Sequence, residues 1–214
     1  MSEGSRRVVL ATHNEHKVHE LAQILAATAT DLDLEVVSMA AYPEVGVVPE
    51  TEVSFVGNAT VKARAVAAAT GLPSLADDSG LSVDVLGGMP GIFSARWSGL
   101  HEGEELARAE KDRRNLRLLL DQIADVPDEH RAAAFRCAAV LALPGGETVA
   151  TEGRVTGVIV REPLGDNGFG YDPIFRPDGD TRTLAQYSDE EKNAISHRGE
   201  AFRKMAPRLR EHLA

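Results

Sequence analysis

Two adjacent carboxylates, Asp77 and Asp78, lie in the segment SLADDSGL between an apolar approach and a Ser-Gly pair. Mg²⁺ is usually held by one or two protein carboxylates together with substrate phosphates and water. Glu50, in the segment PETE, is a candidate for a further oxygen ligand. Because neighbouring strand residues point to opposite faces, the two aspartates are expected to have different roles. The alternative is a turn that ends one strand, since Asp, Ser and Gly are typical turn residues.

A second candidate is the segment THNEHK, which runs from Thr12 to Lys17 between an apolar run and a helical pattern. The N-terminus of a helix presents backbone N–H groups that bind anions. Thr12 and Asn14 add side-chain donors, and Lys17 adds a positive charge. The glycines of a Walker A loop are absent. The segment predicts either a phosphate site or a capped helix with a solvated lysine.

Aromatic residues occur in a third segment, GDNGFGYDP, where glycines flank Phe169 and Tyr171. A ring that is held in such a loop can stack on a flat ligand, as aromatic side chains do on nucleic-acid bases. The alternative is that both rings pack into the core and anchor the loop.

Basic residues are concentrated in a fourth segment, EEKNAISHRG, which contains Lys192, His197 and Arg198. Lysine and arginine suit phosphate and carbonyl oxygens, and histidine can donate from either ring nitrogen. The alternative is a pair of surface helices with solvated charges.

Together the four segments describe a nucleoside triphosphate site, and their motifs resemble one known family. TxNxxK, ADDSGL, GGxPGIxSARWSG, FGYDP and EEKNAISHR occur in this order between Val8 and about Leu209. This set resembles the non-canonical purine nucleoside triphosphate pyrophosphatases, the inosine/xanthosine triphosphate pyrophosphatase family. The resemblance implies a Mg²⁺-dependent homodimer that hydrolyses ITP, dITP or XTP to the monophosphate and pyrophosphate. A pyrophosphatase for another modified nucleotide and a non-catalytic nucleotide sensor are the alternatives.

The resemblance also implies roles for individual residues. Asp78 matches the catalytic base and metal partner, Glu50 matches an acid often assigned to the metal, and Ser79 matches a substrate contact. The other implied substrate-binding residues, for phosphate and for base, are Thr12, His13, Asn14, Glu15, His16, Lys17, Lys62, Phe169, Gly170, Tyr171, Asp172, Lys192, His197 and Arg198.

The chain departs from the family pattern at two nearby positions. Relatives often carry an acid where this chain has Gly57, and their preceding loop commonly has the sequence Glu-Glu-Thr-Gly. Here that loop is PETE, Pro49 to Glu52.

The elements that must position these residues alternate along the first half of the chain. Apolar runs predict strands at residues 6–12, 34–39, 72–76, 81–86, 132–143 and 147–160. Helical patterns cover residues 14–27, 54–70, 104–124, 188–196 and 197–213. This order predicts an α/β protein with a mixed sheet. The resemblance adds two lobes around a long central sheet flanked by helices, an active site in the cleft between them, and one pyrophosphatase domain over residues 1–214.

Length and composition set limits on the class of protein. The 214 residues, 43% hydrophobic and 26% charged, suit one domain with a sizeable core. The net charge of −10 argues against a general nucleic-acid surface and requires cationic side chains to converge on a polyphosphate substrate. One cysteine and no apolar run long enough to span a bilayer indicate a cytoplasmic protein without a membrane partner.

Overall fold

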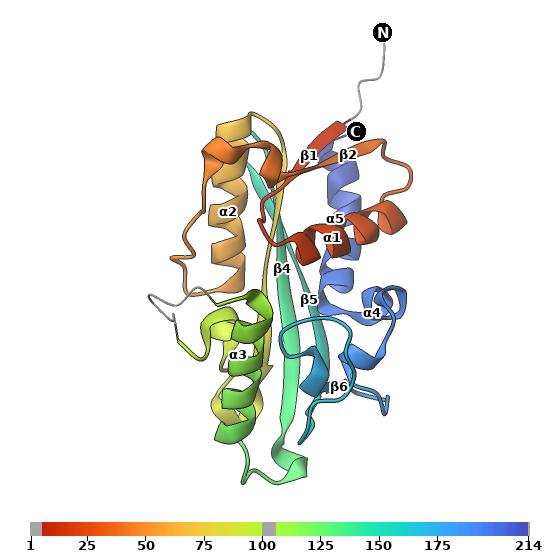
Figure 1. Cartoon of the computed structure of the whole chain (residues 1–214). Coiled ribbons are helices and arrows are strands. Elements are labelled where there is room, and N and C mark those ends of the chain that lie inside the picture. The colour runs from red at the N-terminus through yellow and green to blue at the C-terminus, as the bar shows by residue number, and fades with distance from the viewer. Residues whose placement is uncertain (1–5, 100–105, 214) are drawn as a thin grey trace. The chain divides into compact units, whose positions relative to one another are not determined.

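The computed structural model (Figure 1) describes residues 6–99 and 106–213. The chain divides into two compact units. Unit 1 comprises Met1–Asp78, Cys137–Gly153 and His197–Ala214, and unit 2 comprises Ser79–Arg136 and Arg154–Ser196. The strands are β1 (Arg6–Leu10), β2 (Leu34–Ser38), β3 (Ser74–Val83), β4 (Ala132–Ala142), β5 (Thr148–Ile159) and β6 (Phe175–Pro177). The helices are α1 (Glu15–Thr28), α2 (Phe55–Thr70), α3 (Arg108–Gln122), α4 (Asp189–Ile195) and α5 (His197–Leu213).

The strands form one sheet in the order β2-β1-β3-β4-β5-β6. β1 is parallel to both β2 and β3, whereas β5 and β6 are antiparallel. This mixed sheet with flanking helices confirms the α/β fold class predicted from the sequence. Within the described residues, no helix is both long and apolar enough to cross a membrane.

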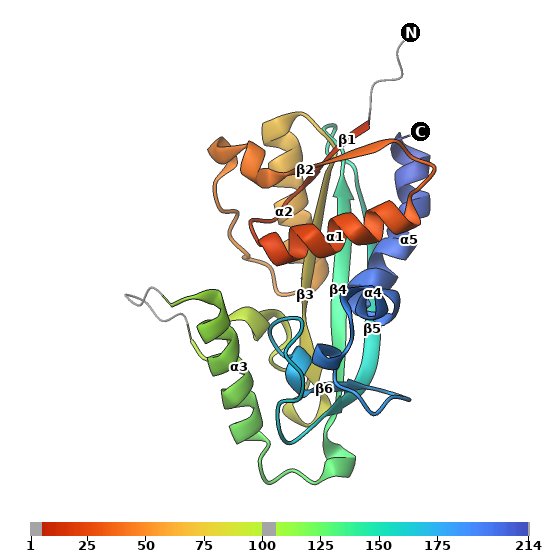
Figure 2. The ribbon, with the colours of Figure 1, turned by 45° about the vertical axis from the view of Figure 1, so that its right-hand side comes forward.

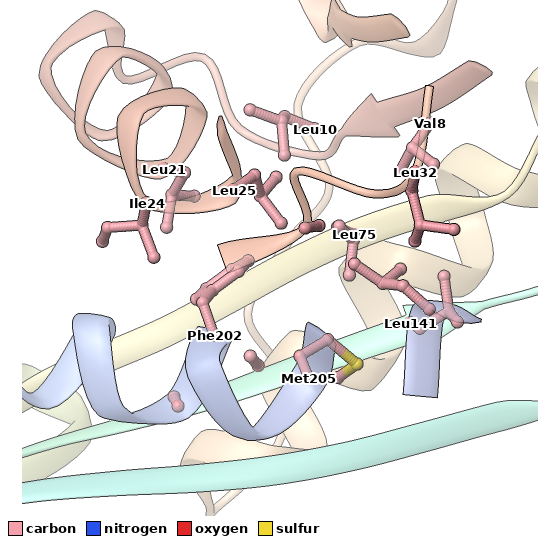
Figure 3. Close-up of a cluster of buried hydrophobic side chains, with 14 of the residues drawn as sticks. Val8, Leu10, Leu21, Ile24, Leu25, Leu32, Leu75, Leu141, Phe202 and Met205 are labelled. Carbon is pink, nitrogen blue, oxygen red and sulfur yellow. The ribbon is translucent and has the colours of Figure 1, made fainter. Parts of the chain in front are cut away.

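In unit 1, α1 and α5 cover one face of the sheet (Figures 1 and 2). Figure 3 shows the side chains that fill this layer, among them Leu21 from α1, Phe202 and Met205 from α5, and Leu10 and Leu75 from the strands. All five side chains are almost completely buried. This packing fixes α1 and α5, which carry charged residues of the candidate site.

Helix α2 covers the opposite face of the same strands. Ala59, Ala63 and Val66 of α2 pack against Val9 and Val140 of the sheet. The small alanine side chains allow the helix to approach the sheet closely. The ends of α2 follow the sequence signals, because Ser54 accepts from the N–H of Gly57 and Gly71 closes the helix in the left-handed conformation.

Unit 2 has a core of its own, in which α3 (Figure 2) packs against strand residues. Leu119 of α3, Leu81 of β3 and Ile174 belong to this cluster, together with the edge-to-face ring pair of Phe135 and Phe175. The predicted start of α3 at residues 104–105 lies outside the described residues, and the helix itself begins at Arg108.

The prediction of two strands joined by a turn at residues 77–80 was wrong. β3 continues without interruption from Ser74 to Val83, and Asp77 and Asp78 lie within it. Aspartate and glycine are unfavourable in strands when they are considered alone. Cationic and amide side chains contact both carboxylates, and these partners lie between 16 and 121 positions away in the sequence.

Candidate active site

Asp77 lies at the centre of a buried ion cluster in unit 1. Lys17 Nζ donates to both of its carboxylate oxygens, at 3.1 Å and 2.9 Å, and Arg198 Nε donates to Oδ2 at 3.3 Å. The Asp77 side chain is 0% exposed. Asp77 is therefore an internal anion that holds two cationic side chains from two different helices.

Helices α1 and α5 supply the partners of Asp77. Lys17 lies in the first turn of α1, and Glu20, one turn later on the same helix, accepts from Arg198 Nη1 at 3.0 Å. Arg198 is the second residue of α5 and is 5% exposed. The guanidinium thus joins two buried carboxylates, Asp77 and Glu20, and ties the beginning of α5 to α1 and β3.

The charges around Asp77 determine its ionisation. Burial by itself raises the pKa of Asp77, but the positive charges of Lys17, Arg198 and Lys62 outweigh burial and hold the pKa well below the ordinary value of 3.8. The carboxylate is therefore ionised throughout the range in which nucleotide hydrolysis is measured.

This shift predicts how stability depends on pH. Because the folded-state pKa of Asp77 is below its unfolded-state value, the ion cluster stabilises the fold fully above about pH 4 and loses this contribution as the pH falls further. We expect Asp77→Asn to be less stable than the wild type at neutral pH and to lose less stability on acidification. Urea unfolding between about pH 6 and about pH 3 measures both slopes. Parallel pH dependences in the two proteins would contradict the assignment.

Asp78 has different partners, as the alternation of strand side chains predicts. Asn58 Nδ2 donates to its Oδ2 at 3.1 Å, and Lys62 Nζ donates to its Oδ1 at 3.3 Å. The same lysine donates to Glu50 Oε1 at 2.9 Å. Since Asn58 and Lys62 are four residues apart on α2, both face β3 from the same side of the helix. Lys62 thereby brings the carboxylates of Glu50 and Asp78 together.

The two groups that meet at Asp78 shift each other's ionisation. Burial raises the pKa of Asp78 and the nearby negative charge of Glu50 raises it further, against the opposing effect of Lys62. Burial tends to lower the pKa of Lys62, but the charges of Asp78, Asp77 and Glu50 raise it overall. The lysine therefore stays charged beside a carboxylate that takes up a proton more readily than a solvated aspartate does.

The two departures from the family pattern are neighbours in space. A Cβ atom on Gly57 would lie 2.6 Å from Glu52 Cβ and 3.0 Å from Ser54 Oγ. The loop that carries Glu50 and Glu52 therefore packs against the first turn of α2 because residue 57 has no side chain. An acid at position 57 would not fit while Glu52 keeps its present place.

The donor set limits how a metal ion could bind. Among the described residues, no group of three or more His, Cys, Asp or Glu side chains is arranged to hold a metal ion. Asp78 and Glu50 nevertheless provide two carboxylates around one lysine. Such a pair fits a divalent cation that takes its remaining ligands from substrate phosphates and water.

The segment between β1 and α1 has the predicted position at a helix N-terminus. Thr12 Oγ1 accepts from the N–H of Asn14 at 3.2 Å, and the Asn14 carbonyl accepts from the N–H of Val18 at 2.9 Å. The ring of His13 is 3.1 Å from the Gly46 carbonyl oxygen. The side chains of Glu15 and His16 lie outside what the structure describes.

In unit 2, one carboxylate organises the aromatic segment. Asp172 Oδ2 accepts from the N–H of Phe169 at 2.9 Å and from Lys192 Nζ at 2.8 Å. Lys192 Nζ lies 4.9 Å from the centre of the Phe169 ring, and Arg108 Cζ lies 6.0 Å from it. Phe169 is half-buried, so its ring is held by a fixed backbone beside two cations.

The two aromatic residues of this segment have different roles. Tyr171 is buried, and its hydroxyl donates to the Ser94 carbonyl at 2.9 Å. The Tyr171 ring is therefore part of the core of unit 2, whereas the Phe169 ring is only half-buried. The N–H of Gly170 donates to Asp112 Oδ2 at 3.2 Å. Ser79 follows Asp78 in β3 and is half-buried.

The structure therefore brings several of the predicted residues together in three clusters. In unit 1, Lys17, Asp77 and Arg198 form one cluster and Lys62, Asp78 and Glu50 form another, whereas Phe169, Asp172 and Lys192 meet in unit 2. His197 is buried at the start of α5 and belongs to unit 1. The list of residues predicted from the sequence did not include Asn58, Glu20 or Asp112. Helical spacing could have indicated the first two, since Asn58 is four residues from Lys62 and Glu20 three from Lys17, but no signal marks Asp112.

Comparison with known proteins identifies the family. A model of the Ham1 family matches residues 8–208. The chain belongs to the Ham1 family. A Ham1-family relative named dITP/XTP pyrophosphatase, from Streptomyces avermitilis, is 55% identical over 207 residues, which is 97% of this chain and 98% of the relative.

Solved structures of the Ham1 family agree with the fold. A HAM1 protein from Coxiella burnetii has a TM-score of 0.82 at 37% identity and covers 96% of this chain and 99% of its own. A nucleoside-triphosphatase, dITP/XTP pyrophosphatase, from Mycobacterium abscessus has a TM-score of 0.72 at 48% identity, over 94% and 99% of the two chains. The family resemblance stated from five sequence motifs is thus confirmed.

Proposed function

We propose that this Ham1-family protein is a pyrophosphatase that hydrolyses the purine nucleotides dITP, ITP and XTP to the monophosphate and pyrophosphate. The observation that carries the proposal is the buried carboxylate of Asp78 with Lys62 and Glu50 beside it. Relatives up to 55% identical over nearly the whole chain are named dITP/XTP pyrophosphatase. Removal of such nucleotides from the nucleotide pool is the role that follows.

The metal in this proposal is Mg²⁺, which Asp78 and Glu50 would hold. Two carboxylates suit Mg²⁺ when phosphate oxygens and water complete its ligands. When bound, the ion supplies charge neutralisation at the phosphates and activates the attacking water. Lys62 Nζ donates to both carboxylates in this structure, so binding of the ion would require the ammonium to take the triphosphate as its partner instead.

Residues of unit 1 are assigned the other roles in the hydrolysis. The water oxygen attacks the α-phosphorus, the bond from this phosphorus to the bridging oxygen breaks, and pyrophosphate leaves. Asp78 accepts the proton of the water, for which its raised pKa is suited. Lys17, Lys62 and the backbone N–H groups around Thr12–Lys17 offset the charge of the leaving pyrophosphate. Asp77 keeps Lys17 in place for this purpose.

Base recognition is assigned to the aromatic segment and to donors on α4 and α5. Phe169 stacks on the purine. The hydrogen bonds from the Phe169 N–H to Asp172 and from the Gly170 N–H to Asp112 set the position of the Phe169 ring. Lys192, His197 and Arg198 favour a base with an oxygen acceptor at position 6. Adenine presents an amino donor there and offers these cationic donors no acceptor.

Phe169→Ala is expected to raise KM for dITP or XTP by about 5- to 150-fold, since stacking on an aromatic side chain contributes about 1–3 kcal/mol per base. The measurement is initial-rate kinetics of pyrophosphate release. Phe93→Ala, which removes another partly exposed ring of unit 2, is the matched control and should leave KM unchanged. An unchanged KM in Phe169→Ala would exclude stacking on this residue.

A substrate panel tests the proposed function itself. The protein is incubated with dITP, XTP, dATP, dGTP and dUTP, each with and without Mg²⁺, and pyrophosphate is measured. Fast release from dITP and XTP with Mg²⁺ is the expected result. Preference for another nucleotide would indicate a different pyrophosphatase, whereas tight nucleotide binding without any product would indicate a sensor.

The assembly and the location belong to the same proposal. The protein is proposed to act as a homodimer in the cytoplasm, where its nucleotide substrates arise. Light scattering coupled to size-exclusion chromatography tests the dimer, and a mass of 22.9 kDa would mean a monomer.

A further inference from the structure

We propose that Asn58 is a positioning residue for the hydrolysis, whose side-chain amide clamps the Asp78 carboxylate to the acidic loop that carries Glu50 and Glu52. This inference rests on the proposed function, since it concerns how the Asp78 site is held ready for the reaction. Asn58 would not touch the substrate and would act only through Asp78 and the loop.

The donor and the acceptor of the Asn58 side-chain amide both form hydrogen bonds within unit 1. Nδ2 donates to Asp78 Oδ2 at 3.1 Å, and Oδ1 accepts from the backbone N–H of Glu52 at 2.9 Å. Asn58 itself is 0% exposed. A fully buried polar side chain with both a donor and an acceptor engaged is a rigid connection between its two partners.

The clamp is attached to a well-defined point of α2. The N–H of Asn58 donates to the Ser54 carbonyl at 3.0 Å, and the Ser54 hydroxyl accepts from the N–H of Gly57 at 3.0 Å. The side chain therefore leaves the helix from a capped first turn, where the backbone is fixed. Lys62, one turn further along the same face, contacts the other oxygen of Asp78.

Gly57 gives the acidic loop the room that the clamp requires. A Cβ atom at residue 57 would lie 2.6 Å from Glu52 Cβ, so the loop could not approach this closely with any other residue there. The hydrogen bond from Glu52 to Asn58 and the close contact at Gly57 hold the same stretch of chain. Glu50, two residues earlier in this stretch, thereby stays within reach of Lys62 and opposite Asp78.

The Asn58 amide supplies both a donor and an acceptor and adds no charge to the site. An aspartate could accept from the Glu52 N–H, but it would remove the donor to Asp78 and add a negative charge to those of Asp78 and Glu50. An alanine would remove both hydrogen bonds. Asn58→Asp therefore loses only the hydrogen bond to Asp78, whereas Asn58→Ala also loses the hydrogen bond from the loop.

The experiment compares Asn58→Asp and Asn58→Ala with the wild type. We expect kcat for dITP with Mg²⁺ to fall by about 10- to 100-fold in both variants, the range found for residues that orient a metal ligand, while KM changes by less than about threefold. Hydrogen exchange of the Glu52 amide should accelerate by about fivefold or more in Asn58→Ala and stay slow in Asn58→Asp. Asn115→Asp, at another buried helical asparagine, is the matched control and should keep its kcat.

The possible outcomes separate the inference from the function on which it rests. Folded Asn58 variants with kcat within about twofold of the wild type would overturn the inference. A Glu52 amide that exchanges equally in wild type and Asn58→Ala would also overturn it. If the wild-type protein released no pyrophosphate from any nucleotide, the proposed function would fail, whereas the exchange rates would still test the clamp.

Discussion

Asp78→Asn is expected to lower the rate of pyrophosphate release from dITP or XTP by about 10²- to 10⁴-fold, the range attributed to a positioned general base. The amide has the size of the carboxylate but neither its charge nor its ability to accept the proton of the water. Nucleotide should still bind, because Lys17, Lys62 and Phe169, which are proposed to bind the phosphates and the base, are unchanged. The measurement is steady-state kinetics with Mg²⁺, together with the melting temperature of the variant.

The matched control is Asp121→Asn, the same chemical change at an exposed aspartate of α3 whose partner is Arg117. This variant should have wild-type kinetics. A folded Asp78→Asn enzyme whose rate is close to that of the wild type would remove Asp78 from the mechanism.

Asp77→Ala is expected to have the largest effect on stability, lowering the free energy of unfolding by about 3–5 kcal/mol. The loss arises because the substitution leaves the cationic side chains of Lys17 and Arg198 in a buried place without their shared anion. Arg198 retains Glu20, which limits the loss. Urea unfolding at neutral pH, monitored by circular dichroism, gives the difference in free energy.

The comparison variant is Glu35→Ala, which breaks the solvent-exposed ion pair with Arg7 in the same unit. Exposed pairs of this kind contribute little, since water and salt already screen both charges. Equal losses of stability in Asp77→Ala and Glu35→Ala would show that the buried Asp77 cluster contributes no more to the free energy of unfolding than an exposed ion pair does.

Much of the secondary structure could be predicted because its signals are local. The boundaries of α2 follow from Ser54 at one end and Gly71 at the other, both of which act within one turn of the helix. The capping box of Ser188 and Glu191 likewise marks the start of α4. Such features depend on neighbours in the sequence and can be recognised without a structure.

The candidate site could be predicted less completely from the sequence, because its residues contact partners that are distant along the chain. The string Asp-Asp-Ser-Gly indicated a turn, yet it continues a buried strand whose carboxylates contact residues 60 and 121 positions away in the sequence. Asn58 was not recognised as part of the site, although it contacts both Asp78 and the acidic loop.

The sequence by itself determined the α/β class, the ends of α2 and the start of α4. Through five ordered motifs it also indicated the purine nucleoside triphosphate pyrophosphatases, a resemblance that the match to the Ham1 family confirms. Only the tertiary structure decided which charges meet: Asp77 with Lys17 and Arg198, and Asp78 with Lys62 and Asn58. The physical reason is that helical and strand patterns record interactions over a few residues. The ionisation of a buried carboxylate depends instead on which distant cations and amides the folded chain brings within about 3 Å of it.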